Sequence, residues 1–391
     1  MDLTCKACGS GPVEVFYELE NVPAQSVLNI TSREKALAFP RGKIALGFCN
    51  ECGFISNAAF EAELLEYDTG YEATQSYSET FNQFARKQAQ DLIQRHNLHG
   101  KKILEIGCGN GEFLTLLCEL GDNRGVGFDP AYVEGRVKCG ENAAVNFVKD
   151  YYSEKYSHYK ADFLYCKMTL EHIAYAGDFV RMVRRAIGSS ERTAIFFQVP
   201  DVTRILKDCA FEDIYYEHCS YFSPGSLARL FGRNGFEVTG LETDYADQYV
   251  MIDSKPAGRV SQSFLPEEDD LATLRNLVSA FSEALTAKIS RWQERIERLA
   301  FEGRRAAIWG SGSKGVSFLT TIGMAHHIQY AVDINPFRQG TFMAGTGHEI
   351  MSPEFMKEYR PDVVIVMNAV YREEIAGTLT GMNLHPEILA L

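Results

Sequence analysis

The sequence predicts an α/β protein: a doubly wound parallel sheet forms the core, a small cysteine-bearing module precedes it, and a second, smaller unit of the same kind follows it. Three observations lead to this prediction. From residue 101 onward, short apolar strand-like runs alternate with helix-like segments, which is typical of parallel sheets. The same alternation starts again near residue 304, after one long helical segment. Two Cys-x-x-Cys pairs precede both units.

Length and composition agree with a globular protein of two or three domains. The chain has 391 residues, of which 46% are hydrophobic. No apolar run is long enough to cross a membrane, and the N-terminus MDLTCKACGS lacks the features of an export signal, so we expect a cytoplasmic protein. The net charge is −13 and the basic residues are scattered, which argues against nucleic acid as the main partner.

Residues 1–62 are predicted to form a metal-binding module. Cys5 and Cys8 make one Cys-x-x-Cys pair, and Cys49 and Cys52 repeat the pattern, each pair being followed by a glycine. Four thiolates on two tight turns suit a tetrahedral Zn²⁺, and such a closed site leaves no position for a reactive water. The sequence therefore predicts a structural zinc, with two coincidental pairs as the alternative.

Residues 63–260 are predicted to form the core. A helical stretch at 63–98, with a tyrosine-rich, turn-broken middle, leads into the first strand, KKILEIG. The elements that follow are the helix GEFLTLLCELG, the strands RGVGFD, AVNFVKD and ADFLYCKMTL, the helix DFVRMVRRAIG and the strand TAIFFQVP. Strands and helices in this order predict a parallel sheet.

A glycine loop joins the first strand to the first helix of the alternation. In ILEIGCGNGEF, the pattern Gly107-x-Gly109-x-Gly111 lets the backbone pass close to a ligand, and the helix start beyond it favours an anionic group. Asp129 ends the next strand, 20 residues after Gly109, where a carboxylate can accept both ribose hydroxyls. The pattern is preceded by Glu105 and differs from the dinucleotide fingerprint GxGxxG.

The strip YYEHCSYFSP, residues 215–224, is the candidate for acid–base chemistry. Glu217 and His218 are adjacent, so on a regular strand their side chains would point to opposite faces. One substrate can meet both only if the backbone is irregular there. The strip follows the fifth strand, on the side where ligands gather at the carboxyl ends of a parallel sheet. The alternative is an aromatic core lining with a satisfied histidine.

The last part of the chain is predicted to be a connecting helix at 261–303 and a Rossmann-like unit at 304–391. Apolar residues recur every three or four positions in the helix, from Leu271 to Ile296. The unit opens with WGSGSKG, a GxGxxG pattern from Gly310 to Gly315, and Asp333 ends its next strand. A nucleotide or sugar-phosphate contact and a purely structural loop both fit this pattern.

The motifs LEIGCGNGEF, GFDP and LEHI resemble those of class I S-adenosylmethionine-dependent methyltransferases. By this resemblance, His172 in LEHI is a motif residue near the cofactor. The resemblance implies that the cofactor-binding residues are Glu105, Gly107 and Gly109 around the methionine part, Asp129 at the ribose, Asp150 at the adenine amino group and Leu170 near the adenosine.

The order of the parts narrows the resemblance. A doubled Cys-x-x-Cys module, a methyltransferase core, the strip YYEHCSYFS and a unit opening WGSGSKG together resemble the zinc-containing C-methyltransferases of TDP-linked 4-keto-deoxysugars. These enzymes belong to natural-product biosynthesis, and the resemblance covers nearly the whole chain. It implies methyl transfer to a carbon next to a ketone through an enolate. His218 would be the base, Glu217 would support its imidazole, and Tyr215 would steady the enolate oxygen.

The chain departs from that family at Tyr71-Glu72-Ala73, where the family tends to read Tyr-x-Tyr; Tyr77 is the candidate replacement. Two other functions stay open. One is an O- or N-methyltransferase of another small metabolite, with His218 deprotonating a hydroxyl or an amine. The other is a non-catalytic regulatory protein that binds S-adenosylmethionine. The sequence does not distinguish a monomer from a homo-oligomer.

Overall fold

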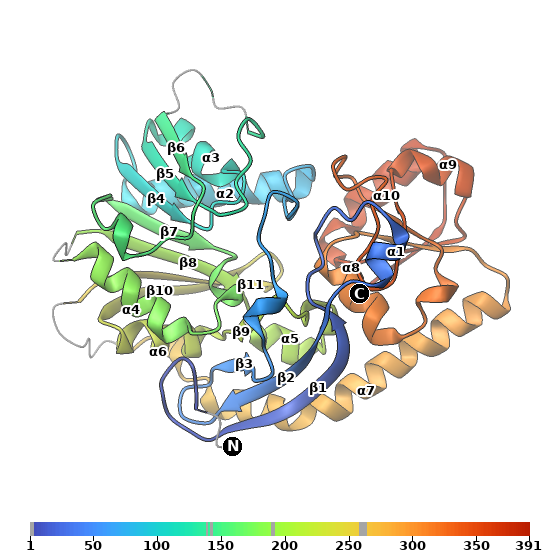
Figure 1. The fold of residues 1–391 in the computed structure, drawn as a ribbon, viewed down its shortest axis with the longest axis horizontal. Coiled ribbons are helices and arrows are strands. Elements are labelled where there is room, and N and C mark those ends of the chain that lie inside the picture. Colours follow the sequence, from blue (N-terminus) through green and yellow to red (C-terminus); the bar gives the residue numbers. More distant parts are fainter. Residues whose placement is uncertain (1–3, 138–139, 141–143, 189–191, 258–263) are drawn as a thin grey trace.

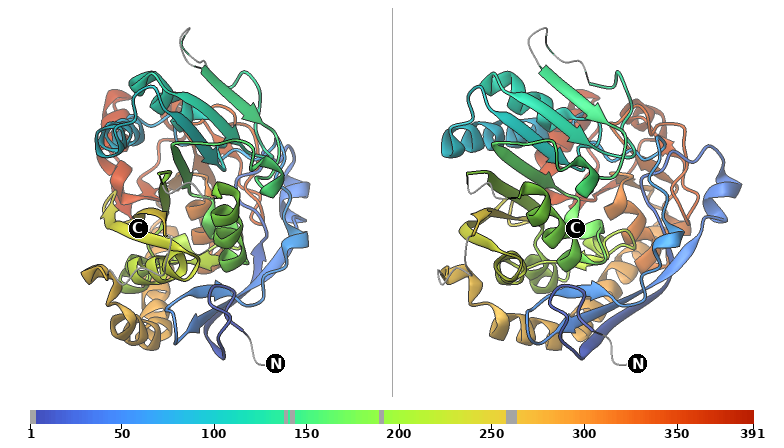
Figure 2. Two further views of the ribbon diagram at one scale, coloured as in Figure 1. Left: turned by 90° about the vertical axis from the view of Figure 1, so that its left-hand side faces the viewer. Right: turned by 60° about the vertical axis from the view of Figure 1, so that its left-hand side comes forward.

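Three sheets organise the chain (Figure 1). The computed structural model describes residues 4–137, 140, 144–188, 192–257 and 264–391. The core and the C-terminal unit lie side by side, and the N-terminal module lies along one edge of both, as the turned views also show (Figure 2). This arrangement confirms the predicted fold class.

The N-terminal module is a four-stranded antiparallel sheet in the order β1-β2-β3-β9. Its strands are β1 (Val13–Pro23), β2 (Arg41–Cys49), β3 (Ile55–Asn57) and β9 (Ser220–Tyr221), with the short helix α1 (Arg33–Leu37) between β1 and β2. The fourth strand does not belong to the N-terminal sequence. It comes from the strip YYEHCSYFSP, with Tyr221 opposite Ile55. The strip is therefore shared between the core and the module.

The core sheet has seven strands in the order β10-β11-β8-β7-β4-β5-β6. All its neighbouring strands are parallel except β11, which runs antiparallel to both β8 and β10. The strands are β4 (Lys102–Ile106), β5 (Arg124–Phe128), β6 (Ala144–Val148), β7 (Phe163–Lys167), β8 (Ala194–Pro200), β10 (Phe236–Asp244) and β11 (Tyr249–Pro256).

Helices cover both faces of the core sheet. These helices are α2 (Glu79–His96), α3 (Glu112–Gly121), α4 (Ala176–Ile187) and α6 (Pro224–Arg233), whereas α5 (Val202–Asp208) packs beside α7 (Leu271–Phe301). Successive strand residues point to opposite faces. Ile103 accordingly packs in the cluster that α2 and α3 cover, whereas Leu104 packs in the cluster that α4 and α6 cover. This two-layer burial explains why the strands read as continuous apolar runs.

The long helix α7 (Leu271–Phe301) joins the core to the C-terminal unit and packs beside β1. Leu274, Phe281 and Leu285 on its apolar stripe are buried, which confirms that the stripe packs on neighbouring elements. The C-terminal sheet is parallel throughout, in the order β14-β13-β12-β15-β16. Its elements are β12 (Ala306–Trp309), α8 (Ser313–Ile322), β13 (Tyr330–Val332), β14 (Ile350–Met351), α9 (Met356–Tyr359), β15 (Val363–Val366), α10 (Arg372–Gly381) and β16 (Glu387–Ala390).

The predicted helical stretch at 63–98 contains one α-helix, α2, in its second half. A single 3-10 turn occupies Ala62–Leu64, and residues 65–78, here called the strap, carry no helix before α2 begins at Glu79. The predicted boundary between residues 260 and 261 lies outside the described residues, and the other domain boundaries stay predictions. None of the described helices combines the length and the apolar composition that crossing a bilayer requires.

The core and the C-terminal unit meet at the start of α2. The Ser78 hydroxyl accepts a hydrogen bond from the backbone N–H of Phe81 and donates one, 2.7 Å long, to the Glu374 carboxylate on α10. Glu374 also accepts from the backbone N–H groups of Glu79 and Thr80, at 3.3 and 3.1 Å. Burial opposes ionisation of Glu374, but these hydrogen bonds outweigh it and lower the pKa of the carboxyl group. The negative charge also suits a helix N-terminus.

Replacing Glu374 by Gln should therefore destabilise the protein by about 0.3–1 kcal/mol at low salt, and by less at high salt, because the contact is partly exposed. A folded-state pKa below the ordinary value of 4.5 gives stability that is complete above that pH and lost as pH falls through the lowered pKa. Urea unfolding at pH 7 and near pH 3 measures both effects. Glu373→Gln, on the same turn of α10, is the matched control, and equal stability of wild type and Glu374→Gln at pH 7 would contradict the prediction.

Candidate active site

One cavity of about 1180 Å³ lies where the core, the strap and the C-terminal unit meet. Its walls come from the glycine loop after β4, the segments after β5 and β7, the strip, and the first loop of the C-terminal unit. The carboxyl ends of parallel strands meet at one edge of a sheet, which is why these loops converge. The volume exceeds the roughly 300–1,000 Å³ that is usual for a single ligand.

The glycine loop approaches the cavity in a conformation that side chains would block. Gly107 has a φ of +72°, and a Cβ at this position would lie 2.0 Å from Thr169 Oγ1. Gly111 has a φ of +87°, and a Cβ there would lie 2.2 Å from the Phe147 ring. At Gly109, by contrast, a Cβ would meet no atom within 4 Å, so the middle of the loop borders open space.

Two predicted cofactor carboxylates border this loop. Asp129 accepts hydrogen bonds of 2.8 Å from the backbone N–H groups of Gly109 and Ala131, which fix its carboxylate at the cavity wall. Glu105 is 3% exposed, and its Oε2 has no hydrogen-bond partner among the described residues. Burial raises the pKa of Glu105 to about 8. A glycine cradle, a fixed carboxylate and an orphaned acidic oxygen together fit the ribose and the α-ammonium group of S-adenosylmethionine.

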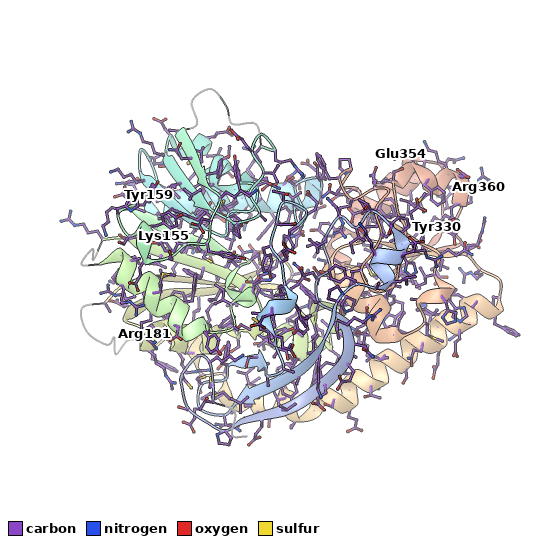
Figure 3. The ribbon with its side chains drawn as sticks, viewed as in Figure 1. Lys155, Tyr159, Arg181, Tyr330, Glu354 and Arg360 are labelled. Atoms are coloured by element: carbon purple, nitrogen blue, oxygen red, sulfur yellow. The ribbon has the colours of Figure 1, made fainter. Side chains whose placement is uncertain are left out.

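The other two predicted cofactor residues, Asp150 and Leu170, do not lie in the middle of the cavity. Asp150 lines the edge of the cavity, where it accepts a hydrogen bond of 2.6 Å from the Tyr156 hydroxyl and one from the Lys155 ammonium. The contact with Lys155 lowers the pKa of Asp150. Lys155 and Tyr159 lie on the outer flank of the core, away from the C-terminal unit (Figure 3).

The expectation that Leu170 lies near the adenosine stays a prediction. Its side chain is fully buried in the core cluster and is not part of the cavity lining, whereas Thr169 and Glu171 are. The cause is local: the chain makes a 3-10 turn over Leu170–His172 directly after β7, which turns Leu170 inward.

The strip makes a turn before β9 begins. The backbone N–H of His218 donates to the Tyr215 carbonyl over 3.1 Å, which supplies the irregular backbone that the Glu217–His218 pair requires. His218 and Tyr215 both line the cavity, and the Tyr215 hydroxyl lies 2.9 Å from His218 Nε2. Burial, followed by the charges of His172 and Lys314, holds the pKa of His218 well below 6.5. The imidazole is therefore neutral at physiological pH.

Glu217 does not support this imidazole, contrary to the expectation. The turn sends its side chain away from His218, and it is not part of the cavity lining. The Ser26 hydroxyl donates to the Glu217 carboxylate and lies 2.7 Å from the Ser313 hydroxyl at the start of α8. Burial raises the pKa of Glu217 to about 7. Its contacts join the strip to the N-terminal module and the C-terminal unit.

The carboxyl group nearest to His218 belongs to Glu171, which sequence reasoning missed. Glu171 Oε1 lies 4.0 Å from His218 Nε2, and both carboxyl oxygens lack a hydrogen-bond partner in the described part of the chain. The His172 ring stands edge-on to the His218 ring, 4.8 Å away, and its Nδ1 lies 2.9 Å from the Tyr67 hydroxyl. The signal for these residues was the motif LEHI, placed at the carboxyl end of the fourth strand.

The first loop of the C-terminal unit faces the same cavity. Asp333 is occupied within the loop, because it accepts from the backbone N–H and the hydroxyl of Ser311, at 3.1 and 2.5 Å, and from the N–H of Asn335 at 2.9 Å. Arg338 is 4% exposed and donates 2.8 Å to the Ser311 carbonyl, while its Nε has no partner among the described residues. The start of α8 and this guanidinium favour an anionic ligand group.

Comparison with known protein families assigns the class. A family described as "Methyltransferase domain" matches residues 81–241, which contain the glycine loop and the strip. A second, described as "C-methyltransferase C-terminal domain", matches residues 247–384. The chain is an S-adenosylmethionine-dependent methyltransferase, and its second half matches the C-terminal domain of C-methyltransferases.

Individual relatives are distant. The C-methyltransferase NovU of Streptomyces niveus is 25% identical over 307 residues, covering 75% of this chain and 72% of that protein. Magnesium protoporphyrin IX methyltransferase of Synechocystis, solved with bound S-adenosylhomocysteine, is 15% identical, with a TM-score of 0.35, and covers 46% of this chain and 84% of its own. The 1,6-didemethyltoxoflavin-N1-methyltransferase of Burkholderia thailandensis is 17% identical, with a TM-score of 0.33, and covers 44% and 78%.

Proposed function

We propose that this methyltransferase acts on a carbon next to a ketone, in a nucleotide-linked deoxysugar or a related small molecule, with His218 as the general base. The observation that carries the proposal is the placement of His218: its imidazole is 4% exposed, neutral, and faces the same cavity as the glycine loop. A neutral imidazole accepts a proton, and proton removal is what makes a carbon next to a ketone nucleophilic.

The proton and the electrons can be followed step by step. His218 takes the proton from the carbon, and the electron pair of the C–H bond moves into the enolate. S-adenosylmethionine, when bound, supplies an electrophilic methyl group on a sulfonium sulfur. The enolate carbon forms the new C–C bond as the C–S bond breaks, and the imidazolium afterwards returns its proton to solvent. The chain itself contributes positioning and charge stabilisation.

Two neighbours of His218 support this step. The Tyr215 hydroxyl lies 2.9 Å from His218 Nε2; turned from the ring to a bound substrate oxygen, its proton would stabilise the charge that develops there and leave Nε2 free to act as the base. The Glu171 carboxyl group lies 4.0 Å from His218, so its carboxylate form would stabilise the imidazolium. Burial strengthens both effects, because little water competes for these charges.

The proposed substrate class rests on the far wall of the cavity. Arg338 and the N-terminus of α8 face the cavity from the C-terminal unit, opposite the glycine loop. A buried guanidinium and helix amides suit the phosphates of a nucleotide-linked substrate, although the protein as a whole is negatively charged. NovU, a relative matched over 307 residues, is named a C-methyltransferase.

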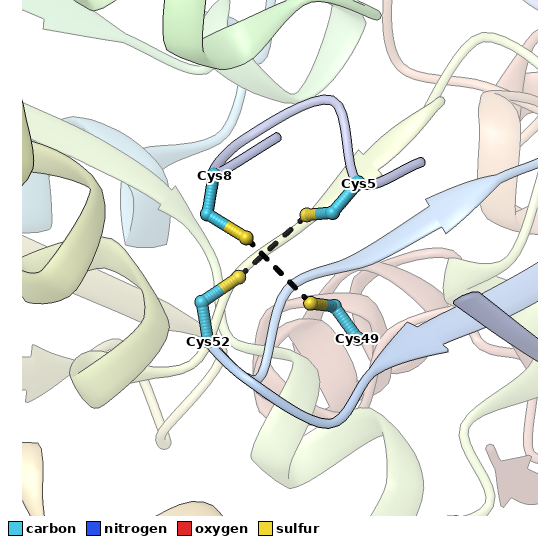
Figure 4. A group of neighbouring side chains, drawn as sticks. All are labelled: Cys5, Cys8, Cys49 and Cys52. Atoms are coloured by element: carbon cyan, nitrogen blue, oxygen red, sulfur yellow. Dashed lines mark hydrogen bonds between the residues drawn. The ribbon is translucent and has the colours of Figure 1, made fainter. Parts of the chain in front are cut away.

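We also propose that the N-terminal module holds one structural zinc ion. The sulfurs of Cys5 and Cys52 lie 3.6 Å apart and those of Cys8 and Cys49 3.7 Å apart, converging on one point (Figure 4). Zn–S bonds of about 2.3 Å in a tetrahedron place sulfurs about 3.8 Å apart, so the spacing fits. In each pair, the N–H of the following glycine donates 2.8 Å to the first cysteine's carbonyl. All four ligands are cysteines, which suits a structural ion.

The function is tested by solvent exchange. The wild-type protein is incubated in D₂O with TDP-linked 4-keto-deoxysugars and without the methyl donor. Deuterium should enter the carbon next to the ketone, adding one mass unit that NMR locates, and adding S-adenosylmethionine should then place a methyl group on the same carbon. A sugar lacking the ketone is the control. Methyl transfer to oxygen or nitrogen without any exchange at carbon would contradict the enolate route.

A further inference from the structure

Lys167, a cation that the motifs do not include, lines the cavity beside the glycine loop. It is the last residue of β7, and the parallel register pairs Ile106 with Cys166, so Lys167 lies next to Gly107 at the sheet edge. The same register pairs Glu105 with Tyr165. Because side chains alternate along strands, Lys167 and Glu105 lie on the same face of the sheet.

The groups that contact the Lys167 ammonium are uncharged. Its Nζ donates 2.6 Å to Gln88 Oε1 on α2 and lies 3.3 Å from the centre of the Phe113 ring on α3. The ion pairs found among the described residues do not include Lys167. Burial, only partly offset by the charge of Glu105, lowers the pKa of Lys167 to about 7. The Lys167 ammonium therefore contacts the Gln88 amide and the Phe113 ring in place of water, and no carboxylate of the described residues forms an ion pair with it.

Glu105 is in the opposite situation on the same wall. It has an oxygen without a hydrogen-bond partner, and burial favours its neutral form. A ligand carrying one positive and one negative group would restore charge to both side chains at once. The α-amino acid end of S-adenosylmethionine is such a zwitterion, and it is the part of the cofactor that the glycine loop is expected to surround.

The other cations that line the cavity are less suited to this role. Lys314 is bonded to Asp213, and Arg338 lies on the C-terminal unit with its guanidinium on the Ser311 carbonyl. Arg86 extends from the exposed side of α2. Among these four, Lys167 alone follows the strand residue that pairs with Ile106, the residue before the glycine loop.

We propose that Lys167 binds the α-carboxylate of S-adenosylmethionine, while Glu105 beside it receives the α-ammonium group. Recognition of the cofactor would then be divided between two ends of the molecule, with Asp129 at the ribose and Lys167 at the amino-acid tail. This inference rests on the S-adenosylmethionine dependence of the protein and is independent of the acceptor and of His218.

Binding measurements with two ligands test the proposal without using activity. S-adenosylhomocysteine carries the amino-acid tail, and 5′-methylthioadenosine lacks it. In calorimetry, Lys167→Met should weaken S-adenosylhomocysteine about 10- to 100-fold, the usual effect of losing a charged hydrogen bond. The affinity for 5′-methylthioadenosine should stay within about twofold, because the adenosine contacts are untouched. Lys87→Met, on the outer side of α2 where it pairs with Asp91 and Asp244, is the matched control and should change neither affinity.

Several outcomes would overturn the assignment. Equal losses for both ligands would mean that Lys167 only maintains the shape of the cavity. Unchanged binding of S-adenosylhomocysteine would mean that its carboxylate lies elsewhere. If Arg86→Met instead lost affinity for S-adenosylhomocysteine but not for 5′-methylthioadenosine, the carboxylate would lie at α2. Lys167→Gln, which keeps a polar group near Gln88 but no charge, carries the same expectation and guards against a Met variant that fails to fold.

Discussion

Replacing His218 by Asn is expected to stop both deuterium exchange and methyl transfer, with a loss of about 10²- to 10⁴-fold, the usual contribution of a general base. Asparagine can still hydrogen-bond to the Tyr215 hydroxyl, but it cannot accept a proton from carbon. The affinity for S-adenosylhomocysteine should stay at the wild-type value, because the glycine loop and Asp129 are unchanged. Mass spectrometry of exchange, a methyl-transfer assay and calorimetry separate these three quantities.

The pH dependence gives an independent check on the same residue. Burial keeps the pKa of His218 well below 6.5, so the base stays neutral at a pH where an ordinary histidine is half protonated. The rate of wild-type exchange should therefore not fall by half at pH 6.5. His99→Asn, a replacement at an exposed histidine, serves as the control. Full methyl transfer by His218→Asn would show that another group removes the proton.

Removing one zinc ligand is expected to have the second large effect. The purified wild-type protein should contain one zinc ion per chain, and Cys49→Ser should contain close to none, because three thiolates no longer close the site. Metal binding in such sites is coupled to folding, so the N-terminal sheet should lose order together with the ion. Elemental analysis measures the zinc, and limited proteolysis measures the order of the first 60 residues.

The same variant should also impair exchange at the substrate carbon. Cys49 ends β2, β2 pairs with β3, and β3 pairs with β9, which directly follows His218 and Cys219. Loss of the metal should therefore disturb β2, β3 and β9 in turn, and with them the position of His218. Cys209→Ser, at a buried cysteine outside the module, should keep its zinc. A wild-type protein without zinc, or a Cys49→Ser protein that retains it, would refute the proposed site.

The predicted parts of the fold are those with a strong local pattern. The strand KKILEIG and its glycine loop could be predicted because an apolar run, a turn and a helix start follow one another directly in the sequence. The strands β9, β10, β11, β14 and β16 were not predicted. Of these, β9 and β14 have two residues each, and β9 pairs with β3 across about 160 residues. Such short strands are stabilised by pairing and not by their own composition.

The same division holds within the site. Cysteine spacing and glycine spacing can be recognised along the chain, and they predicted the cluster of four cysteines and the glycine loop beside the cavity. Whether a side chain faces the cavity depends on turns that the sequence does not spell out. The turn at Tyr215–His218 separates Glu217 from the imidazole, and the 3-10 turn after β7 buries Leu170 while exposing Glu171 to the cavity. Lys167 belongs to none of the motifs, so its proposed role could be inferred only from its neighbours in the structure.

The pairing of β9 with β3 also has a consequence for synthesis on the ribosome. The first three strands of the N-terminal sheet emerge early, but their fourth partner emerges only after about 160 more residues, which takes roughly 10–30 s at ordinary translation rates. During that interval, Ile55 and Ser56 form an open strand edge, which invites pairing with other chains. A metal ion bound by the cysteine knuckles, both already translated, would hold the nascent sheet in register until β9 arrives to close it.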